Sequence, residues 1–534
     1  MNSVFKDTFQ KMAHSSSSVF FALLLLVIVS SSLLRMHKIP DYPLWGDEAR
    51  SILTTANISK YGAPSFENGE VYTRGIIYHY LLYIPLCIFG KTNLFGLRIL
   101  GVIFGALTIL LVYKMASQLG SHLAAFLAAA FIAFASYENF FALSVRFYIA
   151  FQFFSLLTLH LIYLGWFKQI NKYKILAVLS FAATLLVHEL GVVFAIIFFG
   201  YLLIIKKMDL LKDPYLYIMG LVCAACLYFT LVFNPTADIT SGGQANYDSL
   251  PLVIGNAFRF GDKLYFFESL NRLALNYGWL LIIGVLLPPK DRKSPFYYYY
   301  FALIVVLTVI SLISPAPEDR YIFNIYPIFI ILLCYSYVAI IKAVYHSFSQ
   351  YVTFDKWRFA QINRDIIMVC CCMILVFGTA VAVKGSVRKV FNYKSNKQNL
   401  KYAHQLVAQN MTKNDILVST NPDVTWIFIR KPEYFLRQIS WNEQGFFDGK
   451  FRPFEYEVNK KRDMIMVDSL KELASLRDNA NRVWIITDIK LKMFTSPHLI
   501  EFIGKNFHLI SKQKDCAIYS NKTTMQSNLY GVNP

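Results

Sequence analysis

Two adjacent carboxylates and an arginine stand together in the stretch Leu44-Trp45-Gly46-Asp47-Glu48-Ala49-Arg50, just after the first apolar segment of the chain. Carboxylates beside a lipid core are costly unless a partner neutralises them or a function uses them. A carboxylate can take the proton from an acceptor hydroxyl that lies within hydrogen-bond reach. The alternative is a solvated acidic pair that merely begins a helix, and the setting of the pair favours the functional interpretation.

Three further groups combine charged side chains with aromatic rings or an imidazole, and each falls at the end of an apolar segment. They are Ser144-Val145-Arg146-Phe147-Tyr148, His188-Glu189 and Glu318-Asp319-Arg320-Tyr321. A guanidinium grips phosphate through several donors in a fixed fork, so Arg146 and Arg320 could hold a leaving phosphate while Asp47 activates the nucleophile. We expect all four groups to converge on the outer face of a membrane.

Each of these groups has an alternative that stays open. Arg146 and Arg320 could anchor lipid headgroups as long side chains at helix ends. His188 could end a helix, or could join a divalent metal site together with Glu189. Glu318 and Asp319 could form a local turn or an ion pair.

The composition indicates an integral membrane protein. Of 534 residues, 56% are hydrophobic and 16% are charged, whereas soluble domains carry about a quarter of charged residues. The net charge is +19, and the positive residues lie in short loops between apolar segments. This distribution indicates positive-inside topology, and attraction to anionic lipid or phosphate rather than to nucleic acid. The eight cysteines show neither a disulfide framework nor metal-type spacing.

Apolar segments near the length of a membrane crossing predict a polytopic helical protein with about 11 spans. The first span is expected at 19–34 and is retained, since no cleavage site follows it. A long external loop follows at 37–96, in which the apolar segment 76–89 is too short to cross and is expected to lie as a helix at the outer surface. A short second span, which would invert the topology downstream, is the alternative. The remaining spans are expected at 97–114, 122–138, 149–167, 174–188, 190–205, 214–233, 275–288, 296–313, 321–343 and 365–384.

Basic residues decide between the two topologies. With 76–89 kept outside, the loops on one side are rich in lysine and arginine, and the other side receives sparse groups of mixed charge, as the positive-inside rule requires. Asp47, Glu48, Arg146, His188 and Glu189 are then extracytoplasmic. The cytoplasmic loops hold Lys114; Lys168, Lys172 and Lys174; Lys206, Lys207 and Lys212; Lys290, Arg292 and Lys293; and Lys342, Lys356, Arg358 and Arg364.

After residue 384 the composition becomes that of a soluble domain. Strands are expected at 416–419, 464–467, 483–487 and 516–519, and helices at 400–410, 469–476 and 497–507. Their alternation predicts a small α/β domain. The chain would thus consist of a transmembrane domain at 1–384 and a C-terminal extracytoplasmic domain at 385–534, which carries no glycine-rich phosphate loop.

Five stretches carry a resemblance to a known family. They are YPLWGDEARSI, YHYLLYIPLCIFG, LRILGVIFGALTILLVYKMASQLG and AAFLAAAFIAFASYENFFALSVRFYIAF, and more weakly EDRYIFNIYP. In them the chain resembles the GT-C membrane glycosyltransferases that use polyprenyl-phosphate sugars, and it looks closest to the branch of the lipid A aminoarabinose transferases and protein O-mannosyltransferases. The resemblance covers the N-terminal part by motif and the rest by architecture.

The resemblance implies a donor sugar on undecaprenyl or dolichyl phosphate and inversion at the anomeric carbon. It makes Asp47 the catalytic carboxylate, with Glu48 supporting it or helping to bind a metal. Relatives often carry a Lys-Pro-Pro or His-Pro-Pro element where this chain has Tyr72-Thr73-Arg74-Gly75, which puts metal ligation there in doubt. The residues that the resemblance makes candidates for contacts to the donor phosphate are Arg50, Arg74, Arg146, Tyr148 and Arg320.

We therefore expect an enzyme of the plasma (inner) membrane that moves a sugar to a glycan, glycolipid or protein acceptor on the extracytoplasmic side. Its partners are the lipid bilayer, the lipid-linked donor and that acceptor, with no nucleic acid; a divalent metal is left open, with His188, Glu189, Glu318 and Asp319 as candidates for a metal or acceptor site. A transporter or flippase of a lipid-linked saccharide is the alternative, although transporters commonly show paired halves and interrupted helices. A membrane scaffold or sensor would leave the charged groups unexplained. The enzyme requires that Asp47, Arg146 and Arg320 meet in one pocket.

Overall fold

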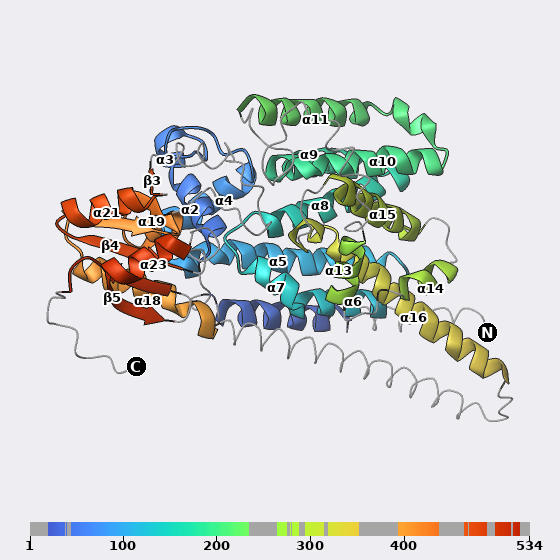
Figure 1. Ribbon diagram of the computed structural model, residues 1–534. Helices are drawn as coiled ribbons and strands as arrows, with labels where there is room; N and C mark the ends of the chain where they lie inside the picture. Colours follow the sequence, from blue (N-terminus) through green and yellow to red (C-terminus); the bar gives the residue numbers. More distant parts are fainter. Residues whose placement is uncertain are drawn as a thin grey trace. The chain divides into compact units, whose positions relative to one another are not determined.

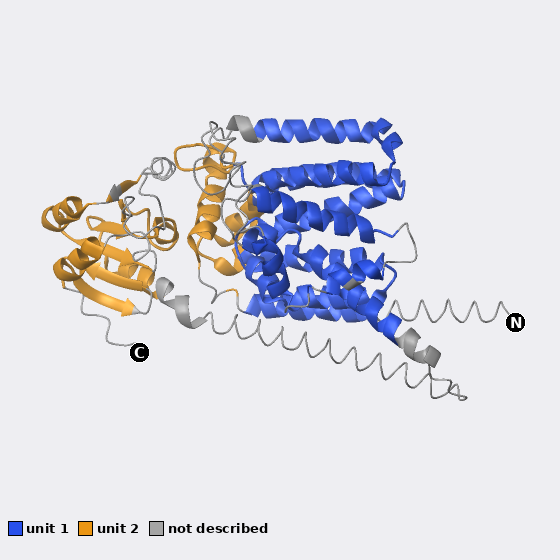
Figure 2. Cartoon of the chain, turned by 45° about the vertical axis from the view of Figure 1, so that its right-hand side comes forward, with its two compact units in different colours: residues 1–37, 73–78, 98–389 blue, residues 38–72, 79–97, 390–534 orange. Residues whose placement is uncertain are grey.

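The computed structural model describes residues 20–37, 39, 44–233, 264–274, 278, 280–287, 294–313, 319–351, 394–436, 464–467, 469–488, 497–513 and 516–523. The chain divides into two compact units, coloured separately in Figure 2. Unit 1 comprises residues 1–37, 73–78 and 98–389, and unit 2 comprises residues 38–72, 79–97 and 390–534. The first predicted external loop therefore contributes to both units, and the predicted domain boundary at residue 385 stays a prediction.

Unit 1 is built from helices (Figure 1), several of which are apolar. Among the described residues, four helices are long and apolar enough to cross a membrane, namely Phe20–His37, Leu94–Ser117, Tyr148–Phe167 and Tyr326–Val344. A helical membrane protein is confirmed, whereas the count of about 11 spans stays a prediction and the span expected at 365–384 lies outside the described residues. The helices are α5 (Leu94–Ser117), α6 (His122–Phe134), α7 (Ser136–Ala142), α8 (Tyr148–Ile162), α9 (Asn171–Val187), α10 (Val193–Ile204), α11 (Pro214–Phe233), α13 (Tyr265–Leu273), α14 (Leu280–Leu286), α15 (Phe296–Ile313) and α16 (Tyr326–Tyr351).

The segment 122–138, predicted as one span, is broken in the structure. Helix α6 ends at Phe134 and α7 begins at Ser136, with a bend of 59° between them. Ala135 between them has an extended backbone, with φ −61° and ψ 129°, which interrupts the helical ladder. Hydropathy did not reveal this break because alanine and serine are common inside helices.

The break presents a buried polar network. Asn139 of α7 accepts a hydrogen bond from Arg35 Nε at 2.8 Å, and Glu138 accepts one from Gln152 Nε2 at 3.1 Å. All four side chains are almost fully buried. Gly105 of α5 makes room for the arginine, since a Cβ there would clash with Arg35 Nη1. Intramembrane charges that are hydrogen-bonded in this way cost less to bury.

Helices α8 and α9 are joined by hydroxyl groups as well as by apolar packing. Thr158 of α8 lies 2.9 Å from the hydroxyl of Ser180 and 3.0 Å from that of Thr184, both on α9. Small hydroxyl residues allow membrane helices to approach closely and bond across their interface. Because α8 begins two residues after Arg146 and α9 ends directly before His188, this contact fixes two of the candidate groups.

Unit 2 contains a sheet. Among the described residues its strands are β1 (Ile416–Ser419), β2 (Tyr434–Leu436), β3 (Ile465–Val467), β4 (Val483–Thr487), β5 (His508–Gln513) and β6 (Cys516–Ser520). Their order is β3-β2-β1-β4-β6-β5. The first four strands are parallel, and β6 is antiparallel to both of its neighbours, β4 and β5. The strands predicted at 416–419 and 483–487 have the same bounds in the structure, and β2 and β5 were not predicted.

Alternate residues of the central strands build a core on each face of this sheet. Val418 and Ile485 face a core with Leu473 of α21 (Leu470–Asn479), together with residues of α23 (Pro497–Asn506). Leu417 and Trp484 face the other core, with residues of α18 (Lys394–Asn410). Burial on both faces is typical of parallel sheets and explains why these strands are continuously apolar.

The N-terminal part of unit 2 consists of α2 (Gly46–Ala56), α3 (Ile58–Tyr61) and most of α4 (Ile76–Phe89). Thr55 Oγ1 lies 2.6 Å from Nδ1 of the buried His79, which ties α2 to α4. Helix α4 has the bounds that the sequence predicts, and its place at the outer surface of the membrane stays a prediction. A further helix, α19 (Pro422–Phe428), follows β1 and was not predicted.

Candidate active site

The two carboxylates at the start of α2 have different surroundings. Glu48 is fully buried, and its Oε2 accepts a hydrogen bond from the backbone N–H of Trp45 at 3.2 Å. This is the contact by which an acidic residue in the first turn satisfies a free donor at a helix start. Asp47 is only partly buried. Of the pair, Asp47 is therefore the carboxylate with access to a substrate.

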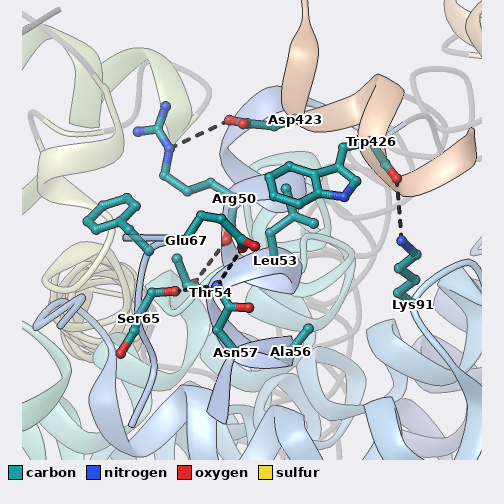
Figure 3. Close-up of a pocket in the computed structure, with 11 residues that line it drawn as sticks. Arg50, Leu53, Thr54, Ala56, Asn57, Ser65, Glu67, Lys91, Asp423 and Trp426 are labelled. Carbon is teal, nitrogen blue, oxygen red and sulfur yellow. Dashed lines mark hydrogen bonds and ion pairs between the residues drawn. The ribbon is translucent and has the colours of Figure 1, made fainter. Parts of the chain in front are cut away.

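Arg50 lies one turn further along α2 and faces a carboxylate. Its Nε is 3.7 Å from Oδ2 of Asp423 on α19, a residue of the same unit (Figure 3). Asp423 is 4% exposed, and the nearby guanidinium offsets part of the cost of burying its carboxylate. The sequence did not single out Asp423, because its partner lies near the other end of the chain.

A second cluster forms in unit 1 around the turn that links α9 to α10. Arg74 Nη2 lies 3.2 Å from Glu189 Oε1, and both side chains are partly exposed. Arg74, Arg146 and Arg320 all lie close enough to His188 for their charges to act on it, as does Glu189. We call these five residues the arginine cluster. The structure thus brings together Arg74, Arg146, His188, Glu189 and Arg320, which are widely separated in the sequence.

The imidazole of His188 is held in place by its neighbours. Its Nδ1 accepts the backbone N–H of Leu190 at 3.1 Å, so the neutral ring carries its proton on Nε2. The 3.5 Å approach of Glu189 Oε2 to the same Nδ1 is not a hydrogen bond in that tautomer. The ring packs against Phe147 and Phe151, with centroids 5.7 and 5.0 Å away.

The guanidinium groups of the other two arginines of the cluster pack against aromatic rings. The guanidinium of Arg146, which is 6% exposed, lies 4.7 Å from the ring centroid of Phe147 and 5.5 Å from that of Tyr148. Arg320 lies 5.4 Å from the ring centroid of Tyr321. Stacking on aromatic faces orients a guanidinium.

Gly75 explains how Arg74 reaches Glu189. Its φ is +76°, a conformation that glycine adopts easily, and a Cβ there would lie 2.8 Å from Phe147 Cδ1. The Gly75 N–H donates to the carbonyl of Val187 at 2.9 Å, directly before His188. The glycine therefore fastens the Arg74 segment to the end of α9.

Asp319 is adjacent to Arg320 in the chain but serves another contact. Its Oδ1 accepts hydrogen bonds from the hydroxyls of Tyr265 at 2.8 Å and Ser269 at 2.5 Å, and lies 3.3 Å from Arg272 Nη2. All three partners belong to α13, so Asp319 anchors that helix. Glu318 lies outside the described residues.

The two candidate groups belong to different units. Asp47, Glu48 and Arg50 are in unit 2, whereas the arginine cluster, Tyr148 and Asp319 are in unit 1. The meeting of Asp47 with Arg146 and Arg320 in one pocket stays a prediction. Among the described residues, no group of three or more His, Cys, Asp or Glu side chains could hold a metal ion.

Comparison with known proteins gives one family match and likenesses to solved structures. Residues 73–233 match the family model described as dolichyl-phosphate-mannose-protein mannosyltransferase. No curated protein matches the chain in sequence. The structure of ArnT from Cupriavidus metallidurans in the apo state matches with a TM-score of 0.65 at 12% identity, over 96% of this chain and 98% of that one. ArnT from the same organism bound to undecaprenyl phosphate matches with a TM-score of 0.61 at 14% identity, over 96% and 99%. Likenesses over nearly the whole of both chains show a shared fold.

Proposed function

This chain is a membrane protein of the GT-C fold, as its sequence motifs predicted, and from that fold we propose that it is a glycosyltransferase. It moves a sugar from a polyprenyl-phosphate donor to a lipid, glycan or protein acceptor on the outer face of the membrane. The observation that carries the proposal is the arginine cluster, in which the charges of three guanidinium groups act on His188 and one of them, Arg74, pairs with Glu189. The mannosyltransferase family match and the undecaprenyl phosphate bound to the similar ArnT support it.

The charge of the arginine cluster suits a phosphate. The cluster holds three guanidinium groups and one carboxylate, Glu189, which pairs with Arg74, so it carries an excess of positive charge. Planar guanidinium forks match the oxygens of a phosphate and become more effective as the leaving group gains charge. In the proposal Arg74, Arg146 and Arg320 hold the donor phosphate, with Tyr148 as a further candidate contact, whereas Arg50 faces the carboxylate of Asp423.

Asp47 supplies the base for the acceptor. The acceptor oxygen attacks the anomeric carbon from the side opposite the phosphate, and its proton passes to the Asp47 carboxylate. The bond between the anomeric carbon and the phosphate oxygen breaks, and the polyprenyl phosphate leaves with the bonding electrons. The configuration at the anomeric carbon inverts. Glu48 supports Asp47 by fixing the start of α2.

The remaining acidic candidates are better suited to positioning. Glu189 is held by Arg74 and Asp319 by α13, so each already has cationic or hydroxyl partners. His188 lies inside the arginine cluster, where it can donate Nε2–H to an anion. A divalent metal stays open as a further component of this site, and the proposed steps run through none.

The proposed topology follows from the charges of the loops. About 11 spans, with Lys and Arg loops in the cytoplasm, leave both candidate groups and residues 385–534 on the extracytoplasmic side of the plasma membrane. Lys174 and Asp213, in two successive predicted cytoplasmic loops, form an ion pair at 2.6 Å. That contact agrees with a shared side for these loops.

Incubation of the purified full-length protein with a panel of polyprenyl-phosphate sugars and acceptors tests the proposal. Mass analysis is expected to detect released polyprenyl phosphate and glycosylated acceptor. The Asp47→Asn variant is expected to lose about 10²–10⁴-fold in rate, as for removal of a general base, and to keep carrier binding. Near-normal transfer by this variant removes Asp47 from its role, and movement of lipid-linked saccharide across proteoliposomes without carrier release would favour the flippase instead.

A further inference from the structure

A small cleft opens in unit 2 beside the segment that carries Asp47. It has a volume of about 210 Å³ and lies between α2, the segment 57–72 and α19 (Figure 3). Drug-sized ligands occupy about 300–1,000 Å³, so the cleft suits a single small ring. Arg50 and Thr54 of α2 line it, one and two turns beyond Asp47 on the same side of the helix.

Charges in the cleft are balanced. Arg50 and Lys91 line it together with Glu67 and Asp423, two cations against two carboxylates. A phosphate placed here would be repelled by both carboxylates. A neutral ligand can accept hydrogen bonds from the two cations and donate to the two carboxylates. The cleft therefore differs in chemistry from the arginine cluster, where positive charge dominates.

The polar groups of the cleft retain hydrogen-bonding capacity. Lys91 Nζ donates to the carbonyl of Trp426 at 3.4 Å, a long bond for an ammonium with three protons, and burial lowers the pKa of this lysine. The Arg50 Nε to Asp423 distance of 3.7 Å exceeds a hydrogen bond. Glu67 Oε2 accepts from Asn57 Nδ2 at 3.3 Å. Hydroxyl groups of a ligand can accept hydrogen bonds from Lys91 and Arg50 and donate to the carboxylates.

Aromatic side chains supply the apolar surface. Trp426 and Phe66 both line the cleft and are partly exposed. Aromatic faces bury large apolar area at low entropy cost and suit the C–H face of a sugar ring. The combination of aromatic faces with balanced polar groups is what a polyhydroxylated ring requires.

The position of the cleft relative to the sheet gives independent support for ligand binding. Strand order reverses between β1 and β4, because β2 and β3 lie on one side of β1 and β4 on the other. In open α/β sheets, ligands bind at the carboxyl ends of the strands where the order reverses. Asp423 and Trp426 belong to α19, which follows the carboxyl end of β1.

We propose that this cleft binds an uncharged saccharide unit of the acceptor. This inference rests on the proposed function, since it makes the saccharide part of the molecule that receives the transferred sugar. Arg50, Glu67 and Trp426 position the saccharide. From Arg50, the helix α2 leads back toward Asp47 at its start. The acceptor is then a glycan or a glycolipid rather than a bare protein.

Saturation-transfer difference NMR on the full-length protein in detergent tests the cleft without donor and without turnover. The probes are glucose, mannose and N-acetylglucosamine, with inorganic phosphate as a separate arm. We expect a saccharide signal from the wild type. Glu67→Gln removes a charged hydrogen-bond acceptor and Trp426→Leu removes an aromatic face, and each should raise the Kd about tenfold. The matched control is Glu70→Gln, the same change in the same segment at a residue that does not line the cleft.

Three outcomes overturn the inference: no signal from any saccharide, equal signals in Glu67→Gln and Glu70→Gln, or binding of phosphate in place of saccharide. A signal that is lost in Glu67→Gln and retained in Glu70→Gln supports it. Asp47→Asn is expected to bind saccharide normally. Failure of the proposed function appears instead in the transfer assay, as absence of carrier release with every donor, so the two failures are distinguishable.

Discussion

At the scale of single residues, charged side chains that are neighbours in the chain have different tasks. Glu48 begins α2 through the N–H of Trp45, and Asp47 beside it is partly exposed. Asp319 anchors α13, and Arg320 beside it lies in the arginine cluster. A sequence motif contains both members of each pair, and only their contacts in the structure show that their roles differ.

Substitution by isosteric amides can distinguish the roles of the two carboxylates of α2. Glutamine serves as well as glutamate in the first turn of a helix, so Glu48→Gln is expected to fold normally and keep sugar transfer within about threefold. Asp47→Asn, with the same change of charge, is expected to lose transfer. Measurement of released polyprenyl phosphate under single-turnover conditions compares them. Equal losses in the two variants would assign Glu48 a chemical role as well.

The proposed contact of Arg74 with the donor phosphate can be tested through carrier binding. Arg74→Gln removes a charged donor, and we expect undecaprenyl phosphate to bind about tenfold more weakly, since hydrogen bonds to charged groups contribute about 1.5–3 kcal/mol. Titration of the purified protein with the carrier measures this. Arg272→Gln is the matched control, because Arg272 is also an arginine paired with a carboxylate at 3.3 Å but anchors α13. Equal weakening in both variants would contradict a specific role for Arg74.

At the scale of elements, short irregular segments position the candidate groups more than the helices do. The extended backbone of Ala135 turns α7 and presents Asn139 to Arg35. The positive φ of Gly75 fastens the Arg74 segment to the end of α9. Helices of the bundle supply rigid supports, and these breaks aim the polar side chains.

Two glycines with nearly the same backbone provide a controlled test of the Gly75 turn. Gly75 has φ +76° and Gly62 has φ +74°, but a Cβ meets Phe147 only at Gly75. Gly62→Ala is expected to cost about 1–2 kcal/mol of stability from the left-handed backbone alone. Gly75→Ala should cost more and should also weaken carrier binding, because it displaces Arg74. Thermal unfolding and carrier titration measure the two effects, and equal behaviour would contradict the clash.

The start of β1 gives a prediction about pH. Burial alone would raise the pKa of Asp415, but hydrogen bonds from Thr412 and the Trp484 indole, with the nearby charge of Arg482, outweigh it and hold the pKa below its usual value. The stability that Asp415 contributes is therefore present above the pKa of about 3.9 of an unfolded aspartate and is lost as the pH falls through the lower folded value.

Asp415→Asn tests this expectation. At pH 7 the variant should lose about 1–3 kcal/mol in the unfolding of the sheet, because it weakens the bonds from Thr412 at 3.0 Å and Trp484 at 2.9 Å. The difference between wild type and variant should shrink as the pH falls below about 4. Urea-dependent proteolysis of residues 394–523 measures the difference. A constant difference between pH 7 and pH 3 would show that the charge of Asp415 contributes nothing.

At the scale of the whole molecule, the distribution of charge between loops predicts on which side of the membrane the candidate groups lie. A thiol-specific reagent that cannot cross membranes tests this in intact cells, with the native cysteines replaced. Asn68→Cys, in the predicted first external loop, is expected to be labelled. Lys172→Cys, in a predicted cytoplasmic loop, should be labelled only after permeabilisation. Both positions are exposed in the structure. The reverse pattern would favour a second span at 76–89.

The sequence by itself determined the membrane character, the resemblance to a fold, helix 76–89 and the strands at 416–419 and 483–487. These depend on hydropathy, periodicity and short motifs, which are properties of neighbouring residues. Only the tertiary structure decided that Asp423 faces Arg50, that Gly75 brings Arg74 to Glu189, that Ala135 breaks a span, and that β2 and β5 join the sheet. Such contacts join residues far apart in the chain, and their energies come from burial and charge pairing that no local pattern contains.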